Sequence, residues 1–280
     1  MNDSVDLIVN VWERNYKTVL RPSYFRSLEE QNLHNFNKLL LINNITEKSD
    51  AYRLADELVK RGEIDSWYDV AEYLPKALDV AGLSHMDLGR VPHYTDAPLV
   101  AVTLSKHPYL LYWDAEVRLR EPHNWIEPSI ELLLKDDRIF CVNPNWLPLG
   151  VDEETLYHQG DFAMSYGFSD QLFLVRPSEF AKSIYQYRCL ASLRYPLSHI
   201  IPTFEQRVDS YARYHRRLRA TYLGATYIHP NEGASYPSLT LRENVKKRVN
   251  KLILRCLSLI PTNNPCFKIN PKRLEKHVFE

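Results

Sequence analysis

Residues 109–116 read YLLYWDAE, an apolar run that ends in two carboxylates two positions apart. The run Tyr109–Trp113 predicts a buried strand, and Asp114 and Glu116 follow it where the chain turns. Two acids at this spacing can both reach one cation, and Mg²⁺ and Mn²⁺ bind carboxylate oxygens together with phosphate oxygens. The stretch therefore favours a metal and phosphate site at a strand end, with a purely structural turn cap as the alternative.

Apolar runs and helical patterns alternate along the first half of the chain. Further strands are predicted at 5–12, 38–42 and 138–142. Helices are predicted at 22–34, 50–61, 67–80, 97–105 and 122–134. This alternation predicts an α/β fold, a mainly parallel sheet flanked by helices, in which ligands bind outside the carboxyl ends of the strands. Farther along we expect a loop at 144–160, strand-like sequence at 162–175 and a helix at 178–193.

Composition and charge narrow the classes of protein. The 280 residues carry 35 basic and 35 acidic side chains, so the chain as a whole is not built to coat nucleic acid. Only 8 glycines occur, and the motifs G-x-G-x-x-G, G-x-x-x-x-G-K-[ST] and G-x-S-x-G are missing. The four cysteines form no C-x-x-C pair, which favours a reduced, cytoplasmic chain. Asp3 and Asp6 beside a short apolar run predict neither a signal peptide nor a membrane span at the N-terminus.

Residues 241–260 differ in character from the rest. They hold six basic residues and one acid, a net charge of +5. Their apolar side chains recur at helical spacing, at Leu241, Val245, Val249, Leu252, Cys256 and Leu259. We therefore predict a main domain over 1–240 and a basic amphipathic C-terminal helix and tail over 241–280. Such a helix either packs its apolar face on the core or lies on an anionic membrane surface.

The order and spacing of these pieces over about residues 5–180 resemble the nucleotide-sugar glycosyltransferases of the GT-A fold, in particular the family-two-like group of bacterial surface polysaccharide synthesis. Residues 7–28, LIVNVWERNYKTVLRPSYFRSL, resemble that family's first strand, polar loop and helix. Residues 38–58, KLLLINNITEKSDAYRLADEL, resemble its second strand and the following helix. Residues 97–116 resemble the helix and strand that lead to its DxD motif, and 122–145 the helix and strand after it. The resemblance implies a GT-A-like, Rossmann-like catalytic domain.

The resemblance also implies a nucleotide site and a metal site at the strand ends. The nucleotide would contact Glu13, Arg14, Asn15, Asn43 and Asp114, and Asp65 is a candidate contact to the base or else a helix cap. Mn²⁺ or Mg²⁺ would be held by Asp114, Glu116 and a late histidine, His229. Two departures matter: Asn43 stands where the family usually has aspartate, and the DxD motif is DxE. An enzyme that needs little or no metal therefore stays open.

Sugar transfer also needs a general base, usually a carboxylate, for the acceptor hydroxyl. Asp170 lies in YGFSDQ (166–171), which resembles the acceptor-site segment of polysaccharide-building transferases. Glu205 lies in PTFEQR (202–207), which fits the family's later acidic motif. If one of them is the base, the sugar inverts at its anomeric carbon, and we expect an inverting enzyme before a retaining one. A surface acid or a helix cap is the alternative for each.

The sequence thus predicts a cytoplasmic glycosyltransferase, peripheral at the inner face of the membrane, that uses a UDP-, GDP-, TDP- or CMP-linked sugar and a glycan or lipid-linked acceptor. The basic run 211–219, YARYHRRLR, is a candidate clamp for the leaving diphosphate or for an anionic acceptor, or a solvated helix face. Three other classes stay open: a non-catalytic nucleotide or glycan binder, a glycoside hydrolase with paired carboxylates, and a nucleic-acid-binding protein. Residues 1–240 carry a net charge of −7, which argues against a nucleic-acid partner.

Overall fold

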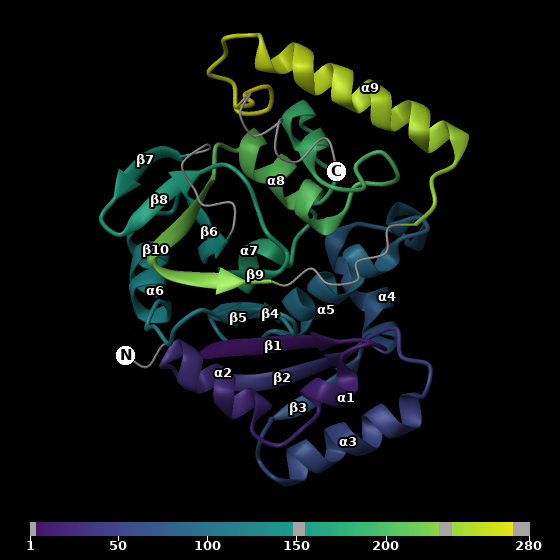
Figure 1. Ribbon diagram of the computed structural model, residues 1–280, viewed down its shortest axis with the longest axis vertical. Coiled ribbons are helices and arrows are strands. Elements are labelled where there is room, and N and C mark those ends of the chain that lie inside the picture. The colour runs from purple at the N-terminus through teal and green to yellow at the C-terminus, as the bar shows by residue number, and fades with distance from the viewer. Residues whose placement is uncertain (1–3, 148–154, 230–236, 271–280) are drawn as a thin grey trace.

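The computed structural model of the chain describes residues 4–147, 155–229 and 237–270, and these fold around one mixed sheet (Figure 1). Its strands are β1 Val5–Val11, β2 Asn37–Ile42, β3 Ser66–Asp69, β4 Tyr109–Asp114, β5 Arg118–Leu119, β6 Ile139–Leu147, β7 Thr155–Gln159, β8 Phe162–Ser165, β9 Leu172–Val175 and β10 Leu218–Ile228. They lie in the order β3-β2-β1-β4-β9-β6-β10-β8-β7, and β5 pairs with β10.

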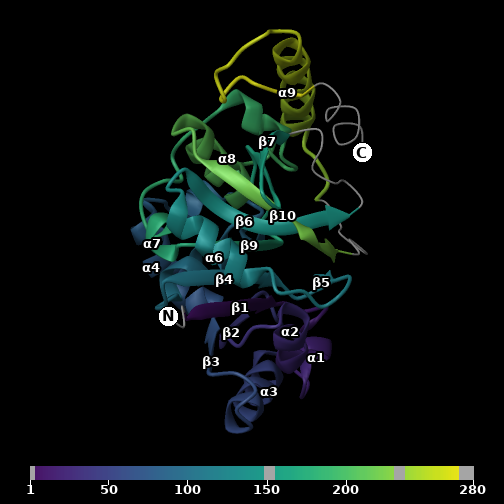
Figure 2. The same cartoon turned by 90° about the vertical axis from the view of Figure 1, so that its left-hand side faces the viewer.

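Helices cover both faces of this sheet. They are α1 Tyr16–Val19, α2 Tyr24–Asn32, α3 Lys48–Lys60, α4 Val70–Ala81, α5 Asp96–Leu104, α6 Ile126–Lys135, α7 Pro177–Phe180, α8 Phe204–Tyr214 and α9 Leu241–Ser258, with 3₁₀ turns η1 His85–Leu88, η2 Pro92–Tyr94 and η3 Leu190–Arg194. One buried core joins the sheet to α2, α3 and α6, and a second joins it to α4, α5 and α8. The predicted α/β fold, a sheet flanked by helices, is confirmed. In Figures 1 and 2, α9 lies at one end of the molecule and α3 at the other.

The strands β3, β2, β1 and β4 form the parallel half of the sheet. β1 alternates its side chains between the two cores, with Leu7 and Val9 in one and Ile8 in the other. Strands buried on both faces read as continuous apolar runs, which is why β1, β2 and β4 are recognisable in the sequence.

The other half of the sheet departs from the sequence-based expectation. β9 is antiparallel to β4 and β6, whereas β6 is parallel to β10. The expected loop at 144–160 contains the end of β6 and all of β7, and its residues 148–154 lie outside the described part of the chain. The expected strand at 162–175 is two strands, β8 and β9. Gly167 lies in the turn between them at a φ of +129°, a conformation that favours glycine.

Two predicted helices are wrong in part. The helix expected at 67–80 begins only at Val70, because Asp69 ends β3 and caps α4 by accepting a hydrogen bond from the Ala71 N–H. The helix expected at 178–193 is reduced to α7 and η3. Between these two turns, Arg207 and Arg188 donate to the Tyr185 carbonyl, so side chains replace the helical partner of this backbone group.

The C-terminal segment is helical as predicted and is cross-linked to the main domain. Thr240 and Glu243 form a capping box at the start of α9, and α9 packs against η3. Cys189 and Cys266 form a disulfide, so the expectation of a fully reduced chain is wrong for this pair. The division into 1–240 and 241–280 stays a prediction. In the described part of the chain, no helix is both long and apolar enough to cross a bilayer.

We expect Cys266→Ser to lower the free energy of unfolding by about 2–5 kcal/mol, because it frees two segments that a disulfide otherwise joins in the unfolded chain. The bridge spans a sequence separation of 77 residues. Cys256→Ser is the matched control, since Cys256 is exposed and unbridged. Guanidinium unfolding without reductant measures the difference. Equal midpoints for the two variants would show that the bridge does not form.

Candidate functional site

The carboxyl ends of the four parallel strands meet at one edge of the sheet. Val11 of β1 pairs with Ile42 of β2, and Ile42 pairs in turn with Asp69 of β3. On the other side of β1, Asn10 pairs with Asp114 at the end of β4. Polar residues that follow these strands are therefore brought together, as expected for a sheet of this class.

The loop after β1 carries three of the residues predicted to contact a nucleotide. The Glu13 carboxylate accepts a hydrogen bond from the Thr46 N–H, which joins the loops after β1 and β2. Asn15 is buried, and its Oδ1 accepts from the Trp12 N–H at 2.9 Å. Its Nδ2 is buried without a hydrogen-bond partner among the described residues. Arg14 is exposed and stacks over the ring of Trp12. An unpaired buried amide is costly, which favours a ligand oxygen near Asn15.

The loop after β2 adds a buried amide and carboxyl pair. Asn43 Nδ2 donates to Asp96 Oδ1 at 2.9 Å, and both residues are buried. Burial raises the pKa of Asp96 to about 6, against the opposing effect of hydrogen bonds from Ala97 and Asn43. Asp96 is the first residue of α5, and the sequence reasoning missed it. Its signal was an acid directly before the apolar helix expected at 97–105.

Asp96→Asn should stabilise the protein at high pH. The pKa of Asp96 is higher in the folded protein than in the unfolded chain, so the carboxyl ionises first in the unfolded chain. The free energy of unfolding therefore falls as the pH rises from 3.8 to about 6. The full cost above pH 6 is about 3 kcal/mol at most. The Asn oxygen can still accept from Asn43. Urea unfolding at pH 4 and pH 8 measures the difference in stability between Asp96→Asn and wild type. We expect little difference at pH 4 and a more stable variant at pH 8. A destabilised variant at pH 8 would contradict the account.

Asp69, at the end of β3, is another residue that the sequence reasoning missed. Its carboxylate is buried, pairs with Lys48 Nζ at 2.6 Å and accepts from the Tyr52 hydroxyl. By contrast, the predicted nucleotide contact Asp65 precedes β3. It bonds to the Lys38 N–H at the start of β2, at the opposite edge of the sheet. The structure therefore does not bring Asp65 to the strand ends. The signal for Asp69 was an acid directly after the two aromatic residues Trp67 and Tyr68.

The turn after β4 presents the acids of the DAE motif. Asp114 accepts a hydrogen bond from the Glu116 N–H at 2.9 Å, and its own N–H donates to the Gln171 carbonyl. The Tyr24 hydroxyl of α2 donates to the carbonyl of Ala115, which fixes the residue between the two acids. The Asp114 side chain remains 39% exposed. The turn is thus held by its backbone while the Asp114 carboxylate stays accessible to a ligand.

His229, directly after β10, comes close to these acids across the sheet. Its Nε2 lies 3.8 Å from Asp114 Oδ1, and its side chain is only 10% exposed. Burial lowers the pKa of His229, but Asp114 facing it, together with the charges of Glu116 and Asp170, raises this pKa above its ordinary value overall. Chain segments more than 100 residues apart therefore meet at one polar group.

The donor atoms of this group fit a divalent cation. Carboxylate oxygens with one imidazole nitrogen suit Mn²⁺ better than Mg²⁺, which prefers oxygen alone. Within residues 4–147, 155–229 and 237–270, no three acidic, His or Cys side chains converge on a single metal position. A cation here would therefore take one or two ligands from Asp114, Glu116 and His229 and the rest from phosphate oxygens and water, as Mg²⁺ and Mn²⁺ often do.

Asp170 and Glu205, the two candidate bases, lie side by side. The Asp170 N–H donates to Glu205 Oε1 at 3.0 Å, which joins the turn before β9 to the first turn of α8. Burial raises the pKa of Asp170 well above its usual value, and Glu205 and then Asp114 raise it further. Two adjacent carboxyls cannot both ionise easily, so the pair retains a proton to a higher pH than an isolated aspartate.

Three arginines of the basic run 211–219 bind other parts of the protein, whereas residues 214–216 are exposed, so the expected solvated face is confined to that short stretch. Arg213 is buried, with Nε 2.8 Å from Asp209 and Nη1 donating to the Pro265 carbonyl. Arg217 pairs with Glu179, and Arg219 donates to Ser165 Oγ. These partners occupy three of the arginines that a diphosphate clamp would need.

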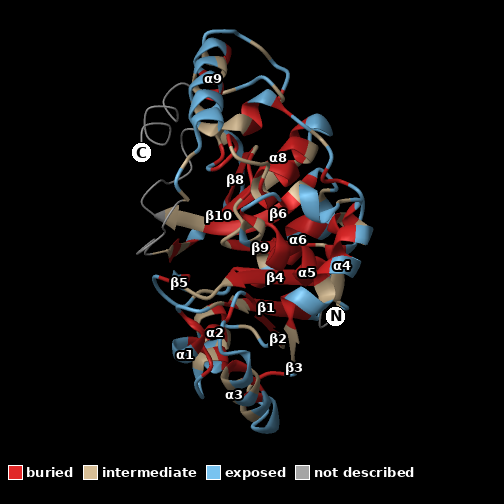
Figure 3. Cartoon of the chain, turned by 90° about the vertical axis from the view of Figure 1, so that its right-hand side faces the viewer, coloured by how far each residue is buried: buried red, intermediate tan, exposed pale blue. Residues whose placement is uncertain are grey.

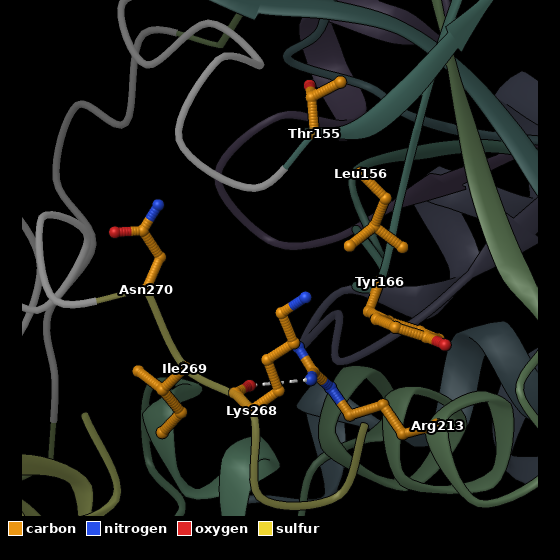
Figure 4. Close-up of a pocket in the computed structure, with 7 residues that line it drawn as sticks. All are labelled: Thr155, Leu156, Tyr166, Arg213, Lys268, Ile269 and Asn270. Carbon is orange, nitrogen blue, oxygen red and sulfur yellow. Dashed lines mark hydrogen bonds between the residues drawn. The ribbon is translucent and has the colours of Figure 1, made fainter. Parts of the chain in front are cut away.

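A separate pocket lies beside this run (Figure 4). Its volume is about 220 Å³. Arg213 of the run lines it, but none of the residues predicted to bind nucleotide or metal, or to act as the base, does so. It is lined by Thr155, Leu156, Tyr166, Arg213, Lys268, Ile269 and Asn270. The volume of this pocket is below that of a usual small-molecule site, so the strand ends remain the candidate site.

Comparison with known proteins yields structural likeness only. No protein-family model and no curated protein matches the sequence. Among solved structures, GalNAc-T7 with UDP, GalNAc and Mn²⁺ is 14% identical at a TM-score of 0.49, over 98% of this chain and 54% of that one. The galactosyltransferase LgtC with donor and acceptor sugar analogs is 16% identical at a TM-score of 0.34, over 63% and 59%. The chain thus spans little more than half the length of either, and likeness at this level says nothing about reaction or residue roles.

Proposed function

We propose that this protein is a glycosyltransferase that moves a sugar from a nucleotide-sugar donor to an acceptor hydroxyl. One observation carries the proposal: the candidate metal ligands and the carboxyl pair Asp170–Glu205 meet at the same edge of the sheet. His229 lies 3.8 Å from Asp114, the Asp114 N–H donates to the carbonyl of Gln171, and Asp170, next to Gln171 in the chain, donates its N–H to Glu205. A transferase needs both functions within reach of one bond, since a diphosphate leaves while a hydroxyl attacks.

The donor side of the site accounts for the polar residues after β1 to β4. Asn15 offers an unpaired buried Nδ2, and Asn43 is fixed by Asp96, so both amides are positioned before a ligand arrives. One or two of Asp114, Glu116 and His229 would hold Mn²⁺, or Mg²⁺ as the second choice, with phosphate oxygens and water as the other ligands. When bound, the cation would neutralise charge that develops on the leaving diphosphate. Without a cation, the acids Asp114, Glu116, Asp170 and Glu205 would repel a diphosphate. We therefore propose a metal-assisted enzyme.

The acceptor side is the Asp170–Glu205 pair. We propose that the ionised carboxylate of this pair accepts the proton of the acceptor hydroxyl as the hydroxyl attacks the anomeric carbon. The raised pKa of Asp170 suits this role, because a base that holds protons more tightly accepts one more readily. A direct attack of this kind inverts the anomeric configuration, which is the outcome we propose.

The geometry favours transfer over glycoside hydrolysis. A hydrolase places its two carboxyl groups about 5–9.5 Å apart, on opposite sides of the bond that it breaks. Here the Asp170 N–H donates directly to Glu205 Oε1 at 3.0 Å, so the two acids lie side by side. This arrangement does not resemble two carboxyls on opposite sides of one glycosidic bond.

The acceptor class, the pathway and the location remain part of this proposal. The resemblance to surface polysaccharide enzymes supports a glycan or lipid-linked acceptor and a place at the inner face of the membrane. Three of the basic residues at 211–219, Arg213, Arg217 and Arg219, are engaged by protein partners, which supports a function without nucleic acid.

A donor screen tests the proposed function. Purified protein is incubated with UDP-, GDP-, TDP- and CMP-linked sugars and a mixture of glycan acceptors, with Mn²⁺ or with EDTA, and nucleotide release is followed by chromatography. We expect release from one donor class, dependent on acceptor and on Mn²⁺, and a proton NMR spectrum of the product that shows inversion. Sugar release from a glycan without any nucleotide would instead establish a hydrolase.

A further inference from the structure

The helix α9 packs on the protein by a face other than its apolar stripe. The residues of α9 that are buried are Asn250, Leu254 and Leu257, and Asn250 Nδ2 donates to Ser198 Oγ. The stripe that the helical spacing singles out points to solvent instead. We call it the outer stripe; within α9 its exposed aliphatic members are Leu241 at 83%, Val245 at 53%, Val249 at 47% and Leu252 at 63%. Figure 3 shows α9 exposed along most of its length.

The orientation of the outer stripe is fixed at both ends of the helix. At the start, Arg90 donates to both carboxylate oxygens of Glu243, at 2.8 and 2.7 Å, and to the Ser238 carbonyl. After the end, the disulfide Cys189–Cys266 and the Ala191 N–H bond to the Cys266 carbonyl tie the returning chain to η3. A helix clamped in this way cannot roll its apolar side chains onto the core.

The charges beside the outer stripe identify what covers it. Six basic residues lie on α9, and its one acid, Glu243, is neutralised by Arg90. Leu259 and Ile260, directly after the helix, extend the exposed apolar surface. Apolar side chains flanked by cations suit a bilayer with anionic headgroups. A second copy of the chain would bring two sets of cations together in a symmetric pair, which is repulsive.

We propose that α9 docks this protein on an anionic lipid surface, with the outer stripe inserted at the headgroup boundary and the flanking cations on the headgroups. This inference rests on α9 alone and is independent of the proposed reaction. It assigns the outer stripe a partner.

Vesicle co-sedimentation of the full chain tests the proposal. The probes are phosphatidylcholine vesicles with and without about 30% phosphatidylglycerol, at low and high salt. Leu252→Glu places a charge in the outer stripe, and Leu134→Glu is its matched control on α6, since the two leucines are 63% and 64% exposed. Arg242→Ala with Arg248→Ala tests the cations. Thermal unfolding of each variant verifies that it folds.

We expect wild type and Leu134→Glu to bind only the anionic vesicles and to dissociate at high salt. Leu252→Glu should bind at least about tenfold more weakly, and the double alanine variant about 25-fold more weakly, at about fivefold per cation. Equal binding by Leu252→Glu and Leu134→Glu would overturn the proposal. Failure of the wild type to bind anionic vesicles would also overturn it. So would a wild-type dimer, seen by sedimentation velocity, that does not bind vesicles and that the Leu252→Glu substitution dissociates.

Discussion

Asp114→Asn should reduce nucleotide-sugar turnover by about a thousandfold, the loss of roughly 4 kcal/mol of transition-state stabilisation. Asp114 ends β4, its carboxylate is accessible, and its charge acts on both His229 and Asp170. The Asn side chain keeps the shape and can still accept from the Glu116 N–H, so the turn survives while the charge for a cation is lost. Steady-state assays with the donor found in the screen measure the effect.

Asp65→Asn is the matched control for this variant. Asp65 is an acid predicted from the sequence for the same nucleotide, but it bonds to the Lys38 N–H at the opposite edge of the sheet. An Asn oxygen can replace that bond, so we expect turnover within about twofold of wild type. If Asp65→Asn were as damaging as Asp114→Asn, the site would not lie at the carboxyl ends of the strands.

Asp170→Asn should lower turnover by about 10²- to 10⁴-fold, the range for removal of a general base. Glu205→Gln should have a smaller effect on the maximum rate and a distinct effect on pH dependence. A base acts when it is ionised, so activity falls as the pH drops through its pKa. Since Glu205 raises the pKa of Asp170, removing its charge should move the acidic limb of the profile to lower pH.

The pH profiles should be recorded at a fixed Mn²⁺ concentration, because a bound cation also acts on these carboxyls. Glu131→Gln, an exposed acid of α6 at 66%, is the control and should leave the profile unchanged. If the acidic limb of the pH–activity profile does not move in Glu205→Gln, Glu205 does not set the pKa of the catalytic base. An active Asp170→Asn variant would exclude Asp170 as the base.

The sequence located strands well where both faces are buried. The run Tyr109–Trp113 is apolar at every position and β1 at five of its seven positions, and short, dense apolar runs of this kind favour buried strands. The sequence predicts secondary structure less well where contacts between distant parts of the chain determine it. Nothing local marks 178–193 as irregular, since Arg207 from α8 supplies a partner to that backbone from a distant part of the chain.

Much the same distinction applies to the site. The sequence predicts each of the main site residues separately, and only the fold shows that they act on one another. These residues are Asp114, Asp170, Glu205 and His229. Asp96, buried against Asn43, was indistinguishable from an acid that begins a helix, because burial is not a local property. Periodicity likewise marks the apolar stripe of α9 but does not say whether it faces the core or solvent.

Nucleotide binding at the strand ends is the central claim, and isothermal titration calorimetry tests it most directly. UDP, GDP, TDP and CMP are titrated into wild type, Asp114→Asn and Asp65→Asn, each with Mn²⁺ and with EDTA. We expect one nucleotide to bind wild type with a Kd of roughly 1 µM to 1 mM in Mn²⁺, Asp114→Asn to bind at least about tenfold more weakly, and Asp65→Asn to match wild type. No binding of any nucleotide, or equal binding by Asp114→Asn, would contradict the account.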